Sequence, residues 1–349
     1  MTESGFRPVI GHEAVIRHLQ RAIRTDRVSH AYLLTGEAGS GRHMVAEAFA
    51  QALVCDTLKN ALSGEDGRPL PADRDIDSCG SCISCKKAAG GNHPDIIRVI
   101  HEKPGVISVQ EIREQVVGTA EIRPYEGGRK IYIIPDAEKM NVQAQNALLK
   151  TIEEPPPYVV MILLSLTQEA LLPTIQSRCV RLSLMPVPDR QIRQYLEETL
   201  RIPDYEARKL AAFAQGNLGR AREAALDPEA EARRNAAVGL MKAADRMDAA
   251  RIAEAARTLK EEKDHITDIL DMMLMFYRDV FLFKASGEDG NLIFRDEADA
   301  VRSQAERTDY RQLYRIFEAL DRARVRLGAN VNFELTMENL LMTLKGQAE

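Results

Sequence analysis

Hydrophobic residues in the first half of the chain gather in short runs, and the segments between the runs have helical spacing. Runs rich in Ile, Val and Leu predict strands at residues 31–36, 95–100, 130–135, 158–166 and 179–184. Periodic apolar positions predict helices over residues 42–55 and 140–154, the second ending before the prolines at 155–157. Strands that alternate with helices indicate an α/β fold with a mostly parallel sheet covered on both faces.

The pattern changes after residue 188, where the strand-like runs stop. Segments rich in Ala, Leu, Glu and Arg follow with helical periodicity at residues 189–200, 204–214 and 218–225, and again from residue 229 onward. We therefore predict three domains, which are an α/β domain at 1–185, a small helical domain at 186–226 and a larger all-α domain at 227–349. The regular spacing of Leu, Ile, Met and Phe in the last domain is typical of the core of a helical bundle.

Composition and charge narrow the class of protein. The chain has 349 residues and a net charge of −5, so it is long enough for two or three domains and is not coated in basic surface. No apolar run approaches the ~18 residues of a membrane helix. The first residues, MTESGFRPVI, lack the basic start and apolar core of a signal peptide. We expect a cytoplasmic protein that does not contact a membrane.

Between the first predicted strand and the next helix lies TGEAGSGRH, which almost matches the phosphate-binding pattern G-x-x-x-x-G-K-[ST]. In that pattern the lysine reaches the β- and γ-phosphates and the hydroxyl binds Mg²⁺. Here Arg42 replaces the lysine and His43 replaces the Ser or Thr. An arginine keeps the charge as a bulkier planar fork, but an imidazole has no hydroxyl for magnesium. We predict a degenerate nucleotide loop formed by Gly36, Gly39, Gly41, Arg42 and His43; the simpler alternative is a turn that only connects a strand to a helix.

The acidic half of such a nucleotide site is also altered. An Asp-Glu pair that holds Mg²⁺ and orients water is expected at the end of the strand at 130–135. The chain has Pro135 and Asp136 at this place, and Glu138 lies two residues further on. Proline cannot bind a metal ion. Because two separate parts of the site depart from the pattern, we predict that ATP and Mg²⁺ are not bound productively.

A cluster of cysteines, CGSCISC, has successive C-x-x-C spacings. Thiolates at this spacing converge on one tetrahedral Zn²⁺, and four protein ligands leave no open position for water. We predict a structural zinc site with the ligands Cys55, Cys79, Cys82 and Cys85. A loop at residues 62–78, dense in Gly, Pro and Asp, separates the first ligand from the others. His93 and His101 are alternative ligands, and free buried thiols or a redox C-x-x-C pair are the other interpretations.

Several motifs occur in a specific order: SHAYLLTG, the glycine-rich loop, the cysteine cluster followed by NHPDIIRV, NALLKTIEEPP and LLPTIQSRCVRL. In this order the chain resembles the delta-prime subunits of bacterial DNA polymerase III clamp loaders, with the tau/gamma motor subunits as close relatives. The likeness covers most of residues 8–225, and the C-terminal helices match in kind and length. It implies an AAA+ fold, with a P-loop-type α/β module, a helical lid and an all-α collar.

The resemblance also implies a function in DNA replication. Five such subunits form an open ring that loads the sliding clamp onto primed DNA as part of the DNA polymerase III holoenzyme. Motor subunits keep the lysine and the acidic pair, whereas delta-prime subunits often lack them and serve as a stator. The departures in this chain therefore favour a subunit without ATPase activity of its own. The implied partners are the tau/gamma motor subunits and the delta subunit, with the clamp and primer–template DNA contacted through the complex.

Individual residues receive roles from the same resemblance. The family's SRC sequence corresponds to Ser177, Arg178 and Cys179. Arg178 is implied to be an arginine finger that reaches the ATP site of a neighbouring motor subunit, where a guanidinium stabilises the charge of phosphoryl transfer. Arg220 corresponds to the second-sensor arginine of the lid. The simpler interpretation makes Arg178 an ordinary surface charge at the start of a strand.

Two functions of other classes are alternatives. An active motor ATPase, in which Arg42 substitutes for lysine, requires the acidic pair that Pro135 interrupts. A zinc-containing nucleic-acid-binding protein outside any ring requires a concentrated basic face, which the net charge of −5 does not favour.

Overall fold

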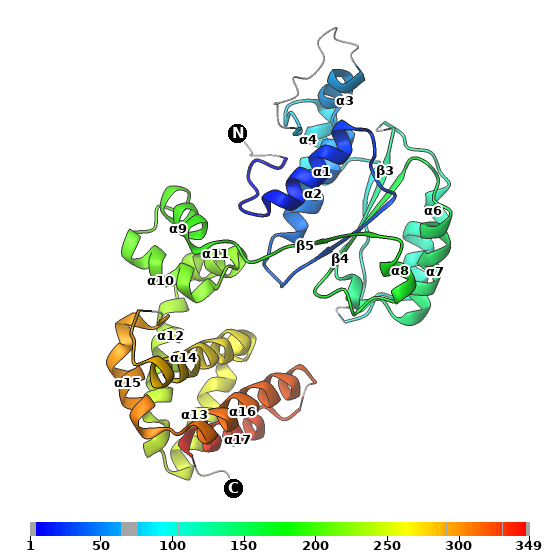
Figure 1. The fold of residues 1–349 in the computed structure, drawn as a ribbon. Coiled ribbons are helices and arrows are strands. Elements are labelled where there is room, and N and C mark those ends of the chain that lie inside the picture. The colour runs from blue at the N-terminus through cyan, green and yellow to red at the C-terminus, as the bar shows by residue number, and fades with distance from the viewer. Residues whose placement is uncertain are drawn as a thin grey trace. The chain divides into compact units, whose positions relative to one another are not determined.

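The computed structural model (Figure 1) describes residues 5–63, 76–103, 105–126, 128–290, 292–329 and 331–346. Most of the predicted loop at 62–78 lies outside these residues. The chain forms two compact units, one of Met1–Ile192 with Gly216–Arg220 and the other of Arg193–Gln215 with Ala221–Glu349. The division into three domains stays a prediction.

The first unit contains one parallel sheet. Its strands are β1 Ala31–Thr35, β2 Ile96–Arg98, β3 Lys130–Ile134, β4 Val159–Ser165 and β5 Val180–Ser183, in the spatial order β2-β3-β4-β1-β5. All neighbouring strands are parallel, so the predicted fold class is confirmed. Every residue of β1, β3 and β4 is buried, which explains why these strands read as continuous apolar runs. The strand predicted at 95–100 is shorter than expected.

Helices cover both faces of this sheet (Figure 1). The elements between and around the strands are α1 Glu13–Arg24, α2 Arg42–Val54, α3 Asp56–Ser63, α4 Ile83–Ala89, α5 Val109–Ile112, η1 Arg113–Val117, α6 Gly118–Ala120, η2 Ala137–Lys139, α7 Val142–Glu153 and α8 Pro173–Gln176. Leu34 of β1 faces an apolar cluster with α1 and α2, and Leu33 faces another with α7. The two helices predicted at 42–55 and 140–154 are confirmed as α2 and α7.

The described residues after β5 contain helices and no strand, as the sequence pattern predicts. These helices are α9 Asp189–Glu198, α10 Asp204–Ala214, α11 Leu218–Leu226, α12 Ala230–Ala243, η3 Ala244–Arg246, α13 Ala249–Glu261, η4 Lys263–His265, α14 Ile266–Ser286, η5 Arg295–Glu297, α15 Ala298–Arg307, α16 Tyr310–Gly328 and α17 Phe333–Lys345. In the second unit α14 supplies much of a single apolar core, with Met273, Phe276 and Tyr277 fully buried. Helices of this unit therefore pack as a bundle.

Candidate functional site

The glycine-rich loop joins the end of β1 to the start of α2, the place at which such loops bind phosphate. Gly39 and Gly41 have φ angles of 80° and 94°, a conformation that favours glycine. Gly41 is the N-cap of α2, and Arg42 is its first residue. The free N–H groups of the first helical turn therefore lie at this loop.

Arg42 is the arginine at the end of the loop, and it is buried, with 6% of its surface exposed. Within the described part of the chain, its Nη1 atom has no hydrogen-bond partner, nor has the Oγ atom of Ser40. Burial lowers the pKa of Arg42, and the charges of Glu138 and Asp136 oppose that effect. A buried guanidinium with an unused donor fits an anion, so this half of the site remains suited to a phosphate group.

The half of the site that would bind magnesium does not fit Mg²⁺. Asp136 follows Pro135 at the end of β3, and its carboxylate accepts a hydrogen bond of 2.9 Å from Lys139 Nζ. Burial alone would raise the pKa of Asp136, but Lys139 and two neighbouring histidines hold it below its ordinary value. The exposed His43 supplies no hydroxyl. Mg²⁺ needs several oxygen ligands, and here one carboxylate is engaged by Lys139 while position 43 offers no hydroxyl. That ATP–Mg²⁺ is not bound productively stays a prediction.

A turn from the segment Gly216–Arg220 contacts the glycine-rich loop directly. Asn217 Nδ2 donates a hydrogen bond of 2.7 Å to the carbonyl of Ala38, and the N–H of Gly219 donates one of 3.0 Å to the carbonyl of Gly39. Asn217 Oδ1 also accepts a 3.1 Å hydrogen bond from the N–H of Arg220 at the start of α11. The predicted residue Arg220 therefore lies next to the loop, but the sequence analysis missed Asn217. The sequence GNLG, in which two glycines enclose Asn217 and Leu218, was the feature that could have indicated this contact.

Glycine at position 219 is required by this contact, and Gly219→Ala is expected to destabilise the first unit. A Cβ atom there would lie 2.6 Å from both the Cα and the carbonyl oxygen of Gly39. We expect a loss of about 1–3 kcal/mol in the free energy of unfolding, the range for overpacking, measured by urea unfolding followed by circular dichroism. The control is Gly239→Ala in α12, where no atom lies within 4 Å. Equal stability of the two variants would contradict this prediction, because it would show that the glycine-rich loop and the Gly216–Arg220 turn can move apart without loss of stability.

The four predicted metal ligands come together. The sulfur atoms of Cys55, Cys79, Cys82 and Cys85 all lie within 4.8 Å of one another. Zinc–sulfur bonds of about 2.3 Å in a tetrahedron place two sulfurs about 3.8 Å apart. The Sγ atoms of Cys79 and Cys85 are already 3.9 Å apart, so small movements close the site around an ion. Among the described residues, no other group of three or more His, Cys, Asp or Glu is arranged in this way.

Local structure directs these sulfur atoms inward. Cys55 follows the last residue of α2, and Cys82 is the N-cap of α4, with its Sγ accepting a hydrogen bond of 3.4 Å from the N–H of Cys85. The N–H groups of Leu58 and Cys79 each donate to Cys55 Sγ at 3.4 Å. A hydrogen bond with the thiol of Cys85 is the main reason that the pKa of Cys55 falls to about 5. At Cys55 the backbone N–H groups and the low pKa favour the thiolate, which is the form that binds metal, whereas the same hydrogen bond raises the pKa of Cys85.

The two histidines considered as substitute ligands lie outside the cysteine group. His101 Nε2 is 3.7 Å from Asp136 Oδ2, near the altered magnesium half of the loop site. His93 is buried, and its Nδ1 accepts a hydrogen bond of 3.1 Å from the N–H of Asp95. The geometry therefore agrees with the choice of Cys55 as the fourth ligand.

Arg178 lies on the surface, between α8 and β5. Its Nη2 atom is 2.9 Å from Glu153 Oε1, and its Nη1 atom donates to the carbonyl of Thr174 at 3.0 Å and to Ser177 Oγ at 3.3 Å. The side chain keeps 39% of its surface exposed, so another molecule can reach it. Cys179, by contrast, has a pKa raised to about 12 by burial, which agrees with an unreactive thiol. The action of Arg178 on a neighbouring subunit stays a prediction.

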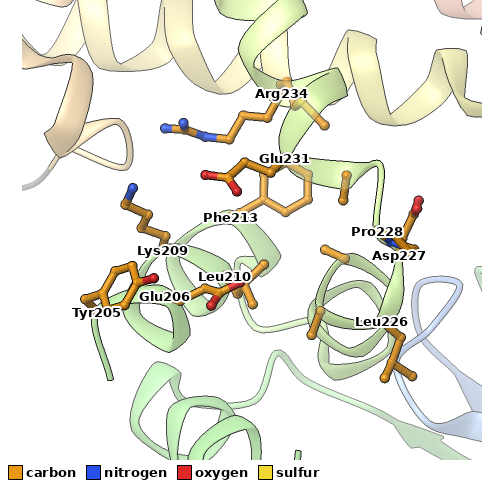
Figure 2. Close-up of a pocket in the computed structure, with 14 residues that line it drawn as sticks. Tyr205, Glu206, Lys209, Leu210, Phe213, Leu226, Asp227, Pro228, Glu231 and Arg234 are labelled. Carbon is orange, nitrogen blue, oxygen red and sulfur yellow. The ribbon is translucent and has the colours of Figure 1, made fainter. Parts of the chain in front are cut away.

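A pocket of about 380 Å³ lies in the second unit among α10, α11 and α12 (Figure 2). Lys209 and Arg234 form ion pairs with Asp296 at 3.1 and 2.7 Å. Figure 2 shows Glu231 pointing into the same space as these two cations. Because charges of both signs line the pocket, it favours no particular class of ligand.

Comparison with known proteins places the chain in a family. Residues 11–188 match the family model described as DNA polymerase III, delta subunit, and residues 229–346 match a second model, which describes the C-terminal region of the delta subunit. These matches define the class, a subunit of DNA polymerase III. The chain is also similar to DNA polymerase III subunit delta' of Bacillus subtilis strain 168, with 30% identity over 95% of both chains. This similarity is more specific than the match to the two family models. The chain belongs to the delta-prime subunit family.

The chain is also similar to other subunits of DNA polymerase III. DNA polymerase III subunit delta' of Pseudomonas aeruginosa is 40% identical over 46% of this chain and 44% of its own length. The tau/gamma subunit of Haemophilus influenzae is 32% identical over 61% of this chain and 29% of its own length. Among solved structures, a gamma subunit-related protein of Thermotoga maritima has a TM-score of 0.44 at 22% identity, covering 95% of this chain and 99% of that one. Within the described residues, every helix is too short or too polar to cross a membrane.

Proposed function

We propose that the chain is a non-hydrolysing, stator-like subunit of the DNA polymerase III clamp loader. The observation that carries this proposal is the arrangement at the end of β3, where Lys139 binds the carboxylate of Asp136. Glu138, the next carboxylate, accepts a hydrogen bond of 3.3 Å from the N–H of Leu166. With both carboxylates engaged and no hydroxyl at position 43, the chain lacks the ligands that hold Mg²⁺ for hydrolysis. Its contribution to ATP hydrolysis is Arg178, supplied to a neighbouring motor subunit.

The partners in this proposal are tau/gamma motor subunits and a delta subunit. They follow from the delta-prime family and from the similarity to tau/gamma proteins. The sliding clamp and primer–template DNA are contacted through the assembled complex. Exposure of Arg178 beside the end of α7 supports a role at a surface between subunits.

The ion that we propose for the cysteine cluster is Zn²⁺ in a structural role. Four sulfur ligands with tetrahedral spacing suit zinc, and the complete ligand set leaves no position for a reacting water. The ion would join the end of α2 to the start of α4, since Cys55 and Cys82 flank these helices.

ATP hydrolysis by the purified chain tests the stator proposal. We expect no turnover with Mg²⁺ present, and Arg42→Ala is expected to leave this result unchanged. A tau/gamma motor subunit assayed alongside is the positive control. The unused Nη1 donor of Arg42 favours weak anion binding without hydrolysis. Turnover that disappears in Arg42→Ala would contradict the proposal and favour the second candidate function, an active ATPase with a divergent loop.

A further inference from the structure

We propose that Glu153 is a positioning residue for Arg178: its carboxylate orients the guanidinium toward the nucleotide of the neighbouring subunit. The proposal rests on the proposed function of Arg178. Its basis is the 2.9 Å contact between Arg178 Nη2 and Glu153 Oε1, two residues that come from different elements of the first unit. The sequence pattern alone assigns Glu153 no partner.

The helix to which Glu153 belongs does not benefit from this residue. Glu153 is the last residue of α7, and Glu154 is the C-cap. The carbonyl end of a helix carries a partial negative charge, so two carboxylates there are unfavourable for the helix itself. Half-exposed ion pairs also contribute little to stability. Stabilisation of α7 therefore does not explain why residue 153 is a glutamate. The contact of Glu153 with Arg178 does explain it.

The guanidinium of Arg178 has enough nitrogen donors to contact its neighbours and a phosphate group at the same time. Nη1 carries two hydrogens, and its two acceptors are the carbonyl of Thr174 and the hydroxyl of Ser177. Glu153 Oε1 forms an ion pair with the guanidinium, 2.9 Å from Nη2. Among the described residues the hydrogen bonds of Arg178 involve Nη1 alone, so Nε–H remains for an incoming phosphate oxygen. Glu153 and a phosphate can thus be bound by the same guanidinium at the same time.

The platform that carries both side chains is fixed. Gln145 of α7 is buried, and its Oε1 accepts a hydrogen bond of 2.8 Å from the N–H of Leu172, the N-cap of α8. Its Nε2 donates to the carbonyl of Met140 at 3.1 Å. Because α7 and α8 are joined in this way, Glu153 holds the guanidinium relative to the body of the unit and not to a loose loop.

The test compares Glu153→Ala, Glu153→Gln and Glu154→Ala in a complex reconstituted with motor subunits, delta subunit, clamp and primed DNA. We expect Glu153→Ala to lower kcat for ATP about 3- to 30-fold with KM unchanged, since a mobile arginine less often occupies the productive orientation. The glutamine variant keeps an acceptor oxygen and is expected to stay within about 3-fold of the unaltered chain. Glu154 is exposed and adjacent, so its alanine variant is the matched control. Unchanged or increased turnover in Glu153→Ala would overturn the proposal.

A second measurement does not depend on ATP. The ¹⁵N relaxation of the Arg178 side chain in the purified chain is expected to show restricted motion that Glu153→Ala reduces and Glu153→Gln largely preserves. Free motion in the unaltered chain would overturn the positioning role. If Arg178→Ala has no effect on turnover, the proposed function fails, and this relaxation measurement still decides whether Glu153 holds the guanidinium.

Discussion

On the proposed function, replacing Arg178 by alanine is expected to lower ATP turnover at the neighbouring motor site by about 10³–10⁵-fold, the range known for arginine fingers. The charge that develops on the transferred phosphoryl group loses its cation, and water replaces a preorganised donor. The side chain is 39% exposed, so its loss is expected to leave the fold of the chain intact. The measurement is the rate of phosphate release by the reconstituted complex in a single turnover.

Two further variants make this result specific. Arg178→Lys keeps the charge without the planar fork and is expected to recover little of the rate. Arg181→Ala removes an exposed arginine from the neighbouring strand β5 and is expected to have no effect. Equal rates for Arg178→Ala and Arg181→Ala would show that Arg178 is an ordinary surface charge.

Cys82→Ser is expected to release the zinc and to destabilise the first unit by several kcal/mol. Structural zinc contributes on the order of 10 kcal/mol of apparent binding free energy, and one missing thiolate removes much of it. Cys82 is the N-cap of α4, and serine is itself a good N-cap, so the helix keeps its capping hydrogen bond while the metal loses a ligand. The measurements are zinc content per chain, expected to be one to one before the substitution, and the thermal midpoint.

The control for the zinc prediction is Cys179→Ser. This cysteine is partly buried and lies outside the cluster, so its variant is expected to keep one zinc per chain. A chelator is expected to reproduce the effect of Cys82→Ser on the unaltered chain. Well-folded, unaltered protein that contains no metal would contradict the four-thiolate site.

Much of the first unit could be predicted because burial on both faces leaves a strong sequence signal. Strands β1, β3 and β4 are fully buried, and their apolar runs gave their positions to within a residue or two. The start of α7 was predicted two residues early, since the side chain of Asn141 caps it by accepting from the N–H of Ala144. Such caps depend on the conformation of single residues, and periodicity does not resolve them.

The features of the candidate sites likewise fall into those that the sequence predicts and those that only the tertiary structure shows. The sequence by itself determined the parallel α/β fold and the change to helices after residue 188, because each depends on residues close together in the chain. It also predicted the altered glycine-rich loop and the four cysteines of the cluster. Only the tertiary structure showed that Cys55 lies with the other three cysteines, that Asn217 binds the carbonyl of Ala38, and that Glu153 contacts Arg178. The physical reason is that these contacts form between residues brought together by the packing of helices on the sheet, which no local pattern of apolar and polar positions records.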